Sequence, residues 1–241
     1  MIKIGVSGAC GRMGKRIIKL AKEDKDFTVV FGLENKEYSD VGKIIDGVRI
    51  GDDPQEVKKC DCLIDFSAPQ ATVGYIPYLV EFRKCAVIGT TGLDEDQQNK
   101  VKEAAKNIPI VFSPNMSVGV NLLFKLIDDA AKILKGYQVD IEEAHHIHKK
   151  DAPSGTAKKI AKIINEQGFS IKVEDIKAER VDEIVGDHKV VFESDVDKIE
   201  LFHSAKTRDI FAQGALLAAK WIIGKSPGLY SMDDVLFGAK F

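Results

Sequence analysis

The amino-acid sequence predicts an α/β fold, with a Rossmann-like, doubly wound parallel sheet and a second α+β domain built on an open mixed sheet. Three observations predict it. Short apolar runs alternate with helical periodicity through the first half of the chain. The glycine-rich turn Gly8–Gly14 separates the first apolar run from the first helix. In the second half, strand patterns follow one another without a helix between them, which indicates an α+β arrangement.

The strands of the first half are short apolar runs. We predict them at Ile2–Val6, Thr28–Leu33, Cys62–Phe66, Cys85–Thr90 and Pro109–Ser113. After the first strand, apolar residues recur at helical spacing as far as Ala21, and further helices are predicted near residues 69–83 and 94–107. Residues 35–59 are predicted to be a loop. Strands that alternate with helices form a mostly parallel sheet covered on both faces.

The second half begins near residues 114–120, where Pro114 and Gly119 mark a boundary. We predict a helix at Asn121–Leu134, a strand at Gln138–His146, a helix from about Ser154, neighbouring antiparallel strands at His188–Glu193 and Lys198–Ala205, and a last helix that carries Leu216 and Ile223. This order places an open sheet beside helices.

The composition excludes several classes of protein. Among the 241 residues, 35 basic and 37 acidic side chains leave a net charge of −2, which argues against nucleic acid or an anionic membrane as a partner. No apolar run approaches the roughly 20 residues that a membrane-spanning helix needs. The chain opens directly on a strand and a glycine turn, which leaves no room for a signal peptide. We therefore expect a cytoplasmic protein.

The cysteines agree with a reducing environment. Cys10, Cys60, Cys62 and Cys85 have neither the paired spacing of a zinc site nor that of a disulfide framework. We expect them to be reduced, buried thiols.

The turn Gly8–Gly14 predicts a dinucleotide site. Glycines permit a tight turn and a close approach of backbone N–H groups to a pyrophosphate, and the helix that follows adds its positive end. Arg12 can contact a phosphate directly. Glu34 lies 20 residues after Gly14, at the end of the second predicted strand, where a carboxylate can accept hydrogen bonds from an adenosine ribose. The alternative is a glycine turn with a purely structural role.

The choice between cofactors depends on the same acidic residue. A carboxylate at Glu34 repels a 2′-phosphate and favours NADH. Lys36 can offset part of that repulsion in NADPH, unless it is simply a solvated loop residue. We expect use of both NADH and NADPH, with some preference for NADH.

A second group of reactive side chains lies between Glu143 and Ala157. Three histidines and two lysines occupy His145–Lys150 at the exit of a predicted strand, where functional groups are commonly displayed. Ser154 can cap the helix that follows, and the N–H groups of Gly155 and Thr156 are suited to a carboxylate. These features predict a site for a small acidic substrate. We expect no metal, because a His-His-x-His run in one strand cannot direct three imidazoles at one ion.

These motifs resemble a known family over nearly the whole chain. The sequence is similar to the 4-hydroxy-tetrahydrodipicolinate reductases, also called dihydrodipicolinate reductases, of lysine and diaminopimelate biosynthesis. The resemblance rests on Gly8–Gly14, Asp65–Ser67, Gly89–Gly92, Ser113–Asn121, Glu143–Ala157 and the later residues His203, Arg208, Phe211 and Gly214. The most specific of these motifs is E-x-H-H-x-x-K-x-D-x-P-S-G-T-A at Glu143–Ala157.

The resemblance implies an activity and a role for each matching residue. Members of the family use NADH or NADPH to reduce a cyclic imine dicarboxylate, formed from the hydroxy precursor by loss of water, to tetrahydrodipicolinate. His145 is implied as proton donor and acceptor, Lys149 as a second proton donor, and His146 as a substrate ligand beside the carboxylate site at Ser154, Gly155 and Thr156. The implied cofactor residues are Gly8, Ala9, Cys10, Gly11, Arg12, Met13, Glu34, Phe66, Gly89, Thr90, Thr91, Ser113, Pro114, Asn115 and Met116.

The resemblance also implies domains and an assembly. We expect a dinucleotide-binding domain at residues 1–116, a substrate-binding and oligomerisation domain at 117–213, and a segment at 214–241 that returns to the first domain. The implied assembly is a homotetramer.

Cations near His145, chiefly Lys149, are expected to lower the pKa of this histidine.

One segment departs from the family and leaves alternatives open. Arg180–His188 lacks the glycine pair that commonly precedes the G-x-H segment, so its role is not assigned. The same domain plan also suits another nicotinamide-dependent dehydrogenase of a small amino or imino acid, or a non-catalytic dinucleotide sensor. A sensor would not require Lys149 or the Pro153–Thr156 turn.

Overall fold

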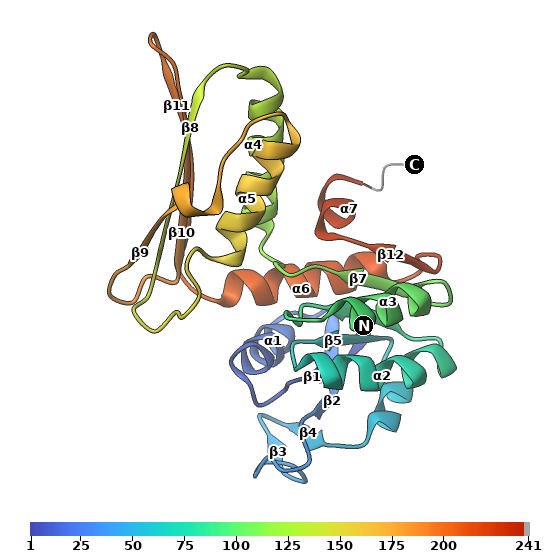
Figure 1. The fold of residues 1–241 in the computed structure, drawn as a ribbon. Coiled ribbons are helices and arrows are strands. Elements are labelled where there is room, and N and C mark those ends of the chain that lie inside the picture. Colours follow the sequence, from blue (N-terminus) through green and yellow to red (C-terminus); the bar gives the residue numbers. More distant parts are fainter. Residues whose placement is uncertain (239–241) are drawn as a thin grey trace. The chain divides into compact units, whose positions relative to one another are not determined.

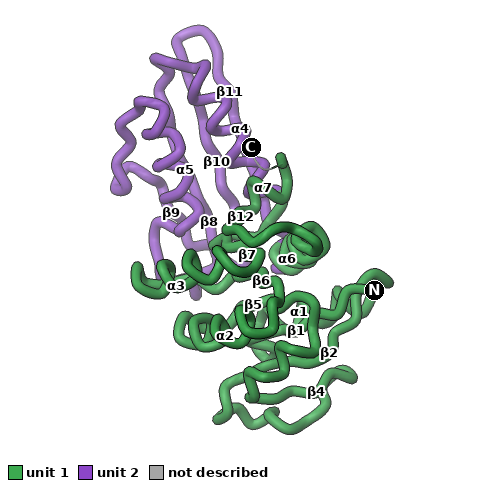
Figure 2. The backbone as a smooth tube through the Cα atoms, turned by 90° about the vertical axis from the view of Figure 1, so that its right-hand side faces the viewer, with its two compact units in different colours: residues 1–118, 211–241 green, residues 119–210 purple. Residues whose placement is uncertain are grey.

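The structure, a computed structural model, describes residues 1–238 and divides them into two compact units. One unit comprises Met1–Val118 together with the segment that begins at Phe211, and the other comprises Gly119–Ile210 (Figure 2). The last three residues of the predicted C-terminal segment, 239–241, lie outside the described residues.

The first unit is built on an eight-stranded sheet in the order β12-β7-β6-β5-β1-β2-β4-β3 (Figure 1). The strands are β1 (Ile2–Ser7), β2 (Phe27–Leu33), β3 (Ile44–Ile45), β4 (Val48–Gly51), β5 (Cys62–Asp65), β6 (Cys85–Ile88), β7 (Pro109–Phe112) and β12 (Gly228–Tyr230). Neighbouring strands are parallel except β3 and β4. The strand order reverses at β1, which makes this a doubly wound, Rossmann-like sheet.

Helices cover both faces of this sheet. They are α1 (Arg12–Glu23), α2 (Pro69–Glu81), α3 (Glu95–Ala105), α6 (Asp209–Ile222) and α7 (Met232–Phe237). One core cluster joins Ile17 of α1 and Ala215 of α6 to the sheet, and a second joins Leu79 of α2 and Val101 of α3 to it. Because both faces of the sheet are almost completely buried, the sequences of its strands are continuous apolar runs.

The loop prediction for residues 35–59 was wrong. This segment contains β3, β4 and the 3₁₀ helix Pro54–Lys59, called η1. β3 and β4 are short and carry no continuous apolar run of the kind that predicted β5, β6 and β7; instead β4 is stabilised by pairing with β2, and β3 by pairing with β4. For the same reason β12, and β9 of the second unit, had no signal in the sequence.

The second unit is a mixed sheet with helices on one face. Its sheet order is β11-β10-β8-β9, with β8 (Gln138–His145), β9 (Lys177–Arg180), β10 (Gly186–Glu193) and β11 (Lys198–Ala205). β8 and β9 are parallel and the other pairs antiparallel. The helices α4 (Val118–Ile133) and α5 (Gly155–Glu166) lie on one side of it (Figure 1), and the 3₁₀ helix η2 (Val173–Asp175) precedes β9.

The other face of this sheet is open. The helical side buries Ile141, Val190 and Phe192 with α4 and α5. Alternation puts the paired residues Glu142, Lys189 and Phe202 on the opposite side, where Phe202 is 60% exposed.

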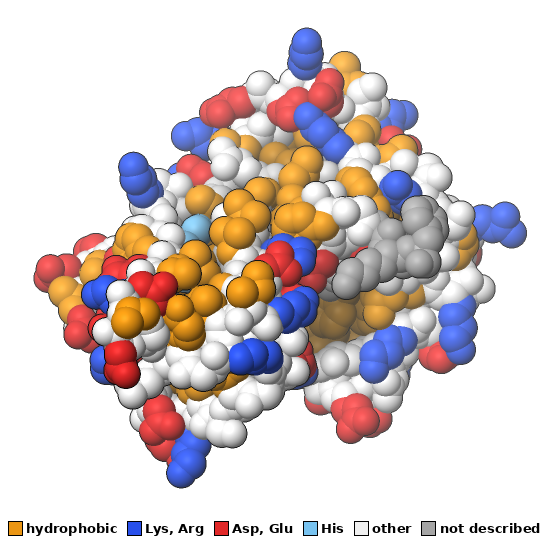
Figure 3. Space-filling model, turned by 90° about the horizontal axis from the view of Figure 1, so that it is seen from above, with side chains coloured by type: hydrophobic (Ala, Val, Ile, Leu, Met, Phe, Trp, Pro, Cys, Tyr) orange, Lys and Arg blue, Asp and Glu red, His pale blue; other side chains and the backbone are white. Residues whose placement is uncertain are grey.

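The surface carries both signs of charge. Figure 3 shows acidic and basic side chains interspersed among apolar ones. Within residues 1–238, no helix is long and apolar enough to cross a membrane.

Candidate active site

The turn after β1 needs glycine at two positions. Gly8 has φ of +71°, and a Cβ there would lie 2.4 Å from the carbonyl oxygen of Phe66. A Cβ on Gly14 would lie 2.1 Å from the carbonyl oxygen of Gly8. The turn is closed by the Gly11 N–H, which donates to the Gly8 carbonyl at 2.9 Å. Backbone is therefore packed on backbone at both glycines, and a side chain at either position would force the turn apart.

The first turn of α1 offers its positive end. The helix begins after Gly11 with no side-chain cap and no acidic residue in the first turn. Arg12 is exposed, Met13 is half-buried, and Ala9 and Cys10 are buried beneath the turn. This arrangement suits a pyrophosphate.

Glu34 is held by backbone N–H groups. Its Oε2 accepts a hydrogen bond from the Cys10 N–H at 3.0 Å, and its Oε1 accepts one from the Asn35 N–H at 3.1 Å. The acidic residue after β2 is thereby attached to the glycine turn after β1. Asn35 and Lys36 are exposed beside it.

The remaining predicted cofactor residues gather at the same edge of the sheet. Ser7, Leu33, Asp65, Ile88 and Phe112 are in register across five neighbouring parallel strands. Each is followed by a predicted segment: Gly8–Met13, Glu34, Phe66, Gly89–Thr91 and Ser113–Met116. Carboxyl ends of parallel strands at a change of strand order form the usual crevice for a dinucleotide.

Residues of these loops pack against one another and form hydrogen bonds with one another. A Cβ on Gly89 would lie 2.3 Å from the Phe66 ring, so the ring packs on bare backbone. Buried Asp65 accepts hydrogen bonds from the hydroxyls of Ser67 and Thr72, each at 2.5 Å, and burial raises its pKa. The Ser113 hydroxyl donates to the Asn115 carbonyl at 2.9 Å. Thr90 and Met116 are buried, Asn115 is half-buried, and Thr91 and Pro114 are exposed.

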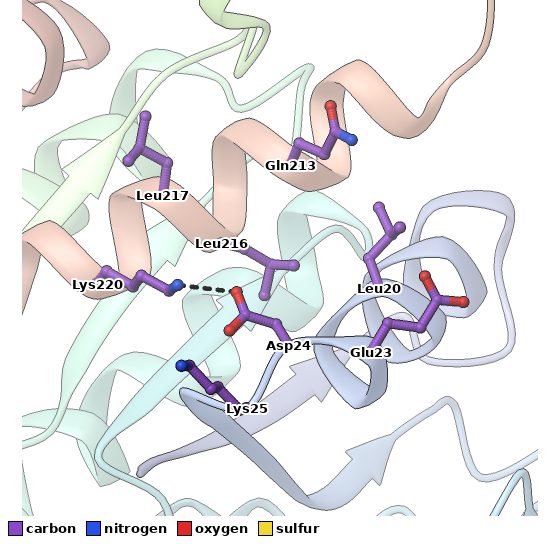
Figure 4. Close-up of a pocket in the computed structure, with 8 residues that line it drawn as sticks. All are labelled: Leu20, Glu23, Asp24, Lys25, Gln213, Leu216, Leu217 and Lys220. Atoms are coloured by element: carbon purple, nitrogen blue, oxygen red, sulfur yellow. Dashed lines mark ion pairs between the residues drawn. The ribbon is translucent and has the colours of Figure 1, made fainter.

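A surface depression elsewhere on this unit is lined by other residues. It has a volume of about 640 Å³ and contains none of the predicted residues (Figure 4). An ion pair of 2.8 Å between Lys220 and Asp24 crosses it. Its residues on α1 start at Leu20, at the end of the helix remote from the glycine turn. At 1.5 Å per residue, the two ends of this helix are about 16 Å apart.

In the second unit, Glu143 connects several parts of the predicted site. Its side chain is fully buried. Oε2 contacts Nδ1 of His145, while Oε1 accepts hydrogen bonds from the Ser154 N–H at 3.1 Å and from Nη2 of Arg180 at 3.0 Å. Glu143 and His145 lie two residues apart on β8 and therefore face the same side of the sheet.

The environment of His145 shifts its titration. Burial is the largest cause and lowers the pKa of His145 below its usual 6.5. The hydrogen bond and charge of Glu143 act in the opposite direction, while the charges of Lys149 and Arg180 lower the pKa further. The lowering of this pKa was expected, and Lys149 is the larger of the two cationic contributions, but the expectation did not include burial, which is the largest cause. The Lys149 ammonium pairs with Asp151 at 2.7 Å, and this pairing lowers the pKa of the Asp151 carboxyl.

The predicted carboxylate site lies at the start of α5. Ser154 is the N-cap, and its hydroxyl oxygen accepts a hydrogen bond from the Ala157 N–H at 3.2 Å. Gly155 is exposed, Thr156 is half-buried, and a Cβ on Gly155 would meet no heavy atom within 4 Å. The space beside Gly155 at the positive end of this helix is open, and an anionic group fits there.

The other two histidines of the motif lie in the turn after β8. His146 is half-buried, and its Nε2 lies 3.5 Å from Nη2 of Arg208. His148 is exposed, with its ring centroid 6.2 Å from that of His146.

Two residues of the site were missed by the sequence analysis. Arg180, on β9, is the register partner of His145, and besides Glu143 it donates to the carbonyl oxygens of Lys149 and Asp151. His188, on β10, places Nε2 3.2 Å from the Ser154 hydroxyl and its ring centroid 5.2 Å from that of His145. Their partners lie 29 to 43 positions away in the sequence, so no local pattern could identify them.

The described part of the chain holds no group of three or more His, Cys, Asp or Glu residues arranged for a metal ion. Cys10, Cys60 and Cys62 are buried free thiols, and Cys85 is a half-buried one. Burial raises the pKa of all four thiols, that of Cys60 to about 12, which disfavours the thiolate that a nucleophile needs.

Comparisons with known proteins agree with both units. The family described as "Dihydrodipicolinate reductase, N-terminus" matches residues 2–116, and "Dihydrodipicolinate reductase, C-terminus" matches residues 119–236. The 4-hydroxy-tetrahydrodipicolinate reductase of Aquifex aeolicus is 43% identical over 98% of each chain. That of Methanosarcina barkeri is 42% identical over 98% of this chain and 99% of its own.

A solved structure has the same fold. It is a dipicolinate-bound dihydrodipicolinate reductase from Paenisporosarcina sp. TG-14, with a TM-score of 0.82 over 96% of this chain and 97% of the other, at 22% identity.

Proposed function

The chain belongs to the dihydrodipicolinate reductase family, and from that premise we propose which residues carry its reaction. Its activity is the NAD(P)H-dependent reduction of 4-hydroxy-tetrahydrodipicolinate, by way of the dehydrated cyclic imine, to tetrahydrodipicolinate in lysine and diaminopimelate biosynthesis. The first unit holds the cofactor, and the second unit holds the small dicarboxylate substrate.

The residues at the carboxyl ends of the parallel strands fit a dinucleotide. Glycines at 8 and 14 let the turn pack closely on the protein's own backbone, and the uncapped start of α1 suits the pyrophosphate. We assign the ribose diol to Glu34, and the rest of the cofactor to the segments that begin with Phe66, Gly89 and Ser113. When bound, the reduced nicotinamide supplies a hydride.

We propose use of both cofactors with some preference for NADH. Hydrogen bonds from the N–H groups of Cys10 and Asn35 support this, because they hold the Glu34 carboxylate where it repels a 2′-phosphate. Lys36 follows Glu34 by two residues and is exposed. Its ammonium reduces the repulsion between Glu34 and a 2′-phosphate without removing it.

Proton delivery is assigned to the second unit. Addition of hydride to the conjugated imine places negative charge on the substrate, which a proton must neutralise. Because Glu143 occupies Nδ1 of His145, Nε2 is the nitrogen available to give that proton. We assign Lys149 as a second proton donor and His146 as a substrate ligand.

Carboxylate recognition is assigned to the start of α5. The N–H groups of Gly155 and Thr156, in the first turn after Ser154, bind one carboxylate of the substrate. The observation that carries the proposal is that one carboxylate, Glu143, contacts both His145 and the Ser154 N–H. The proton donor and the anion site are thereby kept together.

Oxidation of NADH and NADPH by the purified protein tests the assignment, with substrate generated from pyruvate and aspartate semialdehyde by the preceding synthase. We expect Lys149→Ala and His145→Ala each to lose about 10²–10⁴-fold in kcat, as for removal of a general acid. Lys162→Ala, on the exposed side of α5, is the matched control and stays at the wild-type rate. Retained activity in both site variants would refute the assignment, and dinucleotide binding without turnover in wild type would favour a sensor.

We also propose a homotetramer located in the cytoplasm. The open face of the second sheet supports the assembly, because a sheet face that carries an exposed Phe202 gains by burial against another copy.

A further inference from the structure

Glu143 is a buried carboxylate for which the reaction as described above has no chemical use. Neither of its oxygens reaches solvent, since the side chain is fully buried. A buried charge is unfavourable unless it is paired and hydrogen-bonded. Arg180 supplies the opposite charge at 3.0 Å, and the Ser154 N–H supplies a further hydrogen bond. These two partners satisfy Oε1, and the group that contacts the other oxygen is His145.

We propose that Glu143 is a positioning residue, which keeps Nε2 of His145 directed at the substrate and ties that orientation to the start of α5. The inference rests on the proposed function and deepens it. With Nδ1–H donated to Oε2, the neutral ring carries its free lone pair on Nε2, and the protonated ring carries its transferable proton there. When that proton leaves, the Nδ1 proton stays and Glu143 remains a carboxylate.

Among the charged groups around His145, Glu143 is the one that favours the protonated form of the imidazole. From β8, Glu143 raises the pKa of His145. From the following turn and from β9, Lys149 and Arg180 lower it, and Lys149 is partly balanced by Asp151. From β10, His188 contributes an imidazole ring. Burial lowers the pKa of this ring to about 3, so it is neutral near pH 7. Removing the Glu143 charge therefore leaves burial and two cations acting together against protonation.

The second oxygen extends this effect to substrate binding. Oε1 accepts from the N–H of Ser154, the residue that caps α5, and from Arg180, which also binds the carbonyl oxygens of Lys149 and Asp151. A shift of this carboxylate moves the imidazole, the cap and the lysine turn together. Substitution of Glu143 is thus expected to change both kcat and KM.

Glu143→Gln tests the proposal, because the amide has nearly the same shape and lacks the charge. The limb of the pH profile on which activity falls as His145 loses its proton should move to lower pH. Each pH unit of that shift means about tenfold less activity above the limb. Glu166→Gln, at the exposed end of α5, is the matched control and keeps the wild-type profile. An unchanged profile in Glu143→Gln would overturn the proposal.

A readout independent of turnover is histidine NMR. With five histidines in the chain, ¹⁵N- and ¹³C-labelled histidine gives a resolvable set, and His145→Asn identifies the signal. We expect wild type to show the Nδ1–H form of neutral His145, and Glu143→Gln to show mixed tautomers and a lower pKa. An identical tautomer and pKa in both proteins would contradict a positioning role.

Should Glu143→Gln fail to fold, Glu143→Asp keeps the charge on a shorter side chain. We expect it to keep the wild-type pH limb and raise the KM for the imine several-fold, because a shorter carboxylate cannot reach His145 and the Ser154 N–H together. A wild-type KM in a folded Glu143→Asp would contradict the proposal. Failure of the proposed function has a different signature, namely retained activity in His145→Ala and Lys149→Ala.

Discussion

Burial of His188 in the second unit makes the free energy of unfolding depend on pH. It is buried, and desolvation lowers its pKa from 6.5 to about 3. Below pH 6.5 the unfolded chain binds a proton at this position that the native ring does not bind. The free energy of unfolding therefore decreases as the pH falls from 6.5 toward 3.

We expect this residue to remove up to about 1.4 kcal/mol of stability per pH unit in that range. Urea unfolding of wild type and His188→Gln at pH 7, 6 and 5 measures the effect. The variant should show a shallower dependence on pH, whatever its stability at pH 7. His148→Gln, which changes an exposed ring, keeps the wild-type slope. Parallel slopes for wild type and His188→Gln would contradict the prediction.

Glu34 decides between the two cofactors by its charge. Glu34→Gln removes the repulsion of a 2′-phosphate and weakens the hydrogen bonds accepted from a ribose diol, each effect being about 1–2 kcal/mol. We expect the ratio of kcat/KM for NADPH to that for NADH to rise by about tenfold or more. Glu37→Gln, on the same loop and exposed, should leave the ratio unchanged. Steady-state rates with each cofactor check this, and a constant ratio in Glu34→Gln would rule out the assignment of the ribose.

At the scale of elements, the glycine turn and α1 form one unit of structure. A methyl group on Gly14 would lie 2.1 Å from the Gly8 carbonyl oxygen, so α1 must move away from the turn in Gly14→Ala. We expect loss of dinucleotide binding by at least about tenfold and destabilisation of about 1–3 kcal/mol, as for overpacking. Calorimetric titration with NADH and thermal unfolding measure the two effects.

Gly74 gives the matched control within α2. A Cβ there meets no heavy atom within 4 Å, and the position lies inside the helix Pro69–Glu81. Gly74→Ala should leave dinucleotide binding unchanged and stabilise the protein by about 0.4–1 kcal/mol, because alanine favours the helix and restricts the unfolded chain. If Gly14→Ala and Gly74→Ala had the same dinucleotide affinity and the same stability, the close approach of backbone at Gly14 would have no effect on either.

At the scale of the whole molecule, the proposed tetramer is expected to use the open face of the second sheet. Phe202→Asp places a charge on that face, and we expect it to dissociate the proposed tetramer to smaller species. Ile44→Asp, at a 72% exposed position on β3 of the first unit, is the control and keeps the assembly. Light scattering after gel filtration gives the mass, and a tetramer that survives Phe202→Asp would place its interface elsewhere.

Much of this architecture was accessible from the sequence because its signals are local. The longer strands and helices show their periodicity within a few residues, and the predicted strand Thr28–Leu33 is β2 with one residue fewer. The antiparallel pairing predicted for His188–Glu193 and Lys198–Ala205 is that of β10 and β11. The strands β3, β4, β9 and β12 were not predicted, because they lack a continuous apolar run and are stabilised by pairing with neighbouring strands.

The sequence by itself determined the fold class, the family and the chemistry of the two motifs. A glycine turn followed by a helix and by Glu34 is a complete local pattern, and so is the run from His145 to the cap at Ser154. Only the tertiary structure decided how the second motif is held. Sheet pairing brings Arg180 and His188 to Glu143, His145 and Ser154, and burial rather than Lys149 dominates the pKa of His145. The physical reason is that hydrogen bonds between strands and the removal of water act between residues distant in sequence, where no local pattern records them.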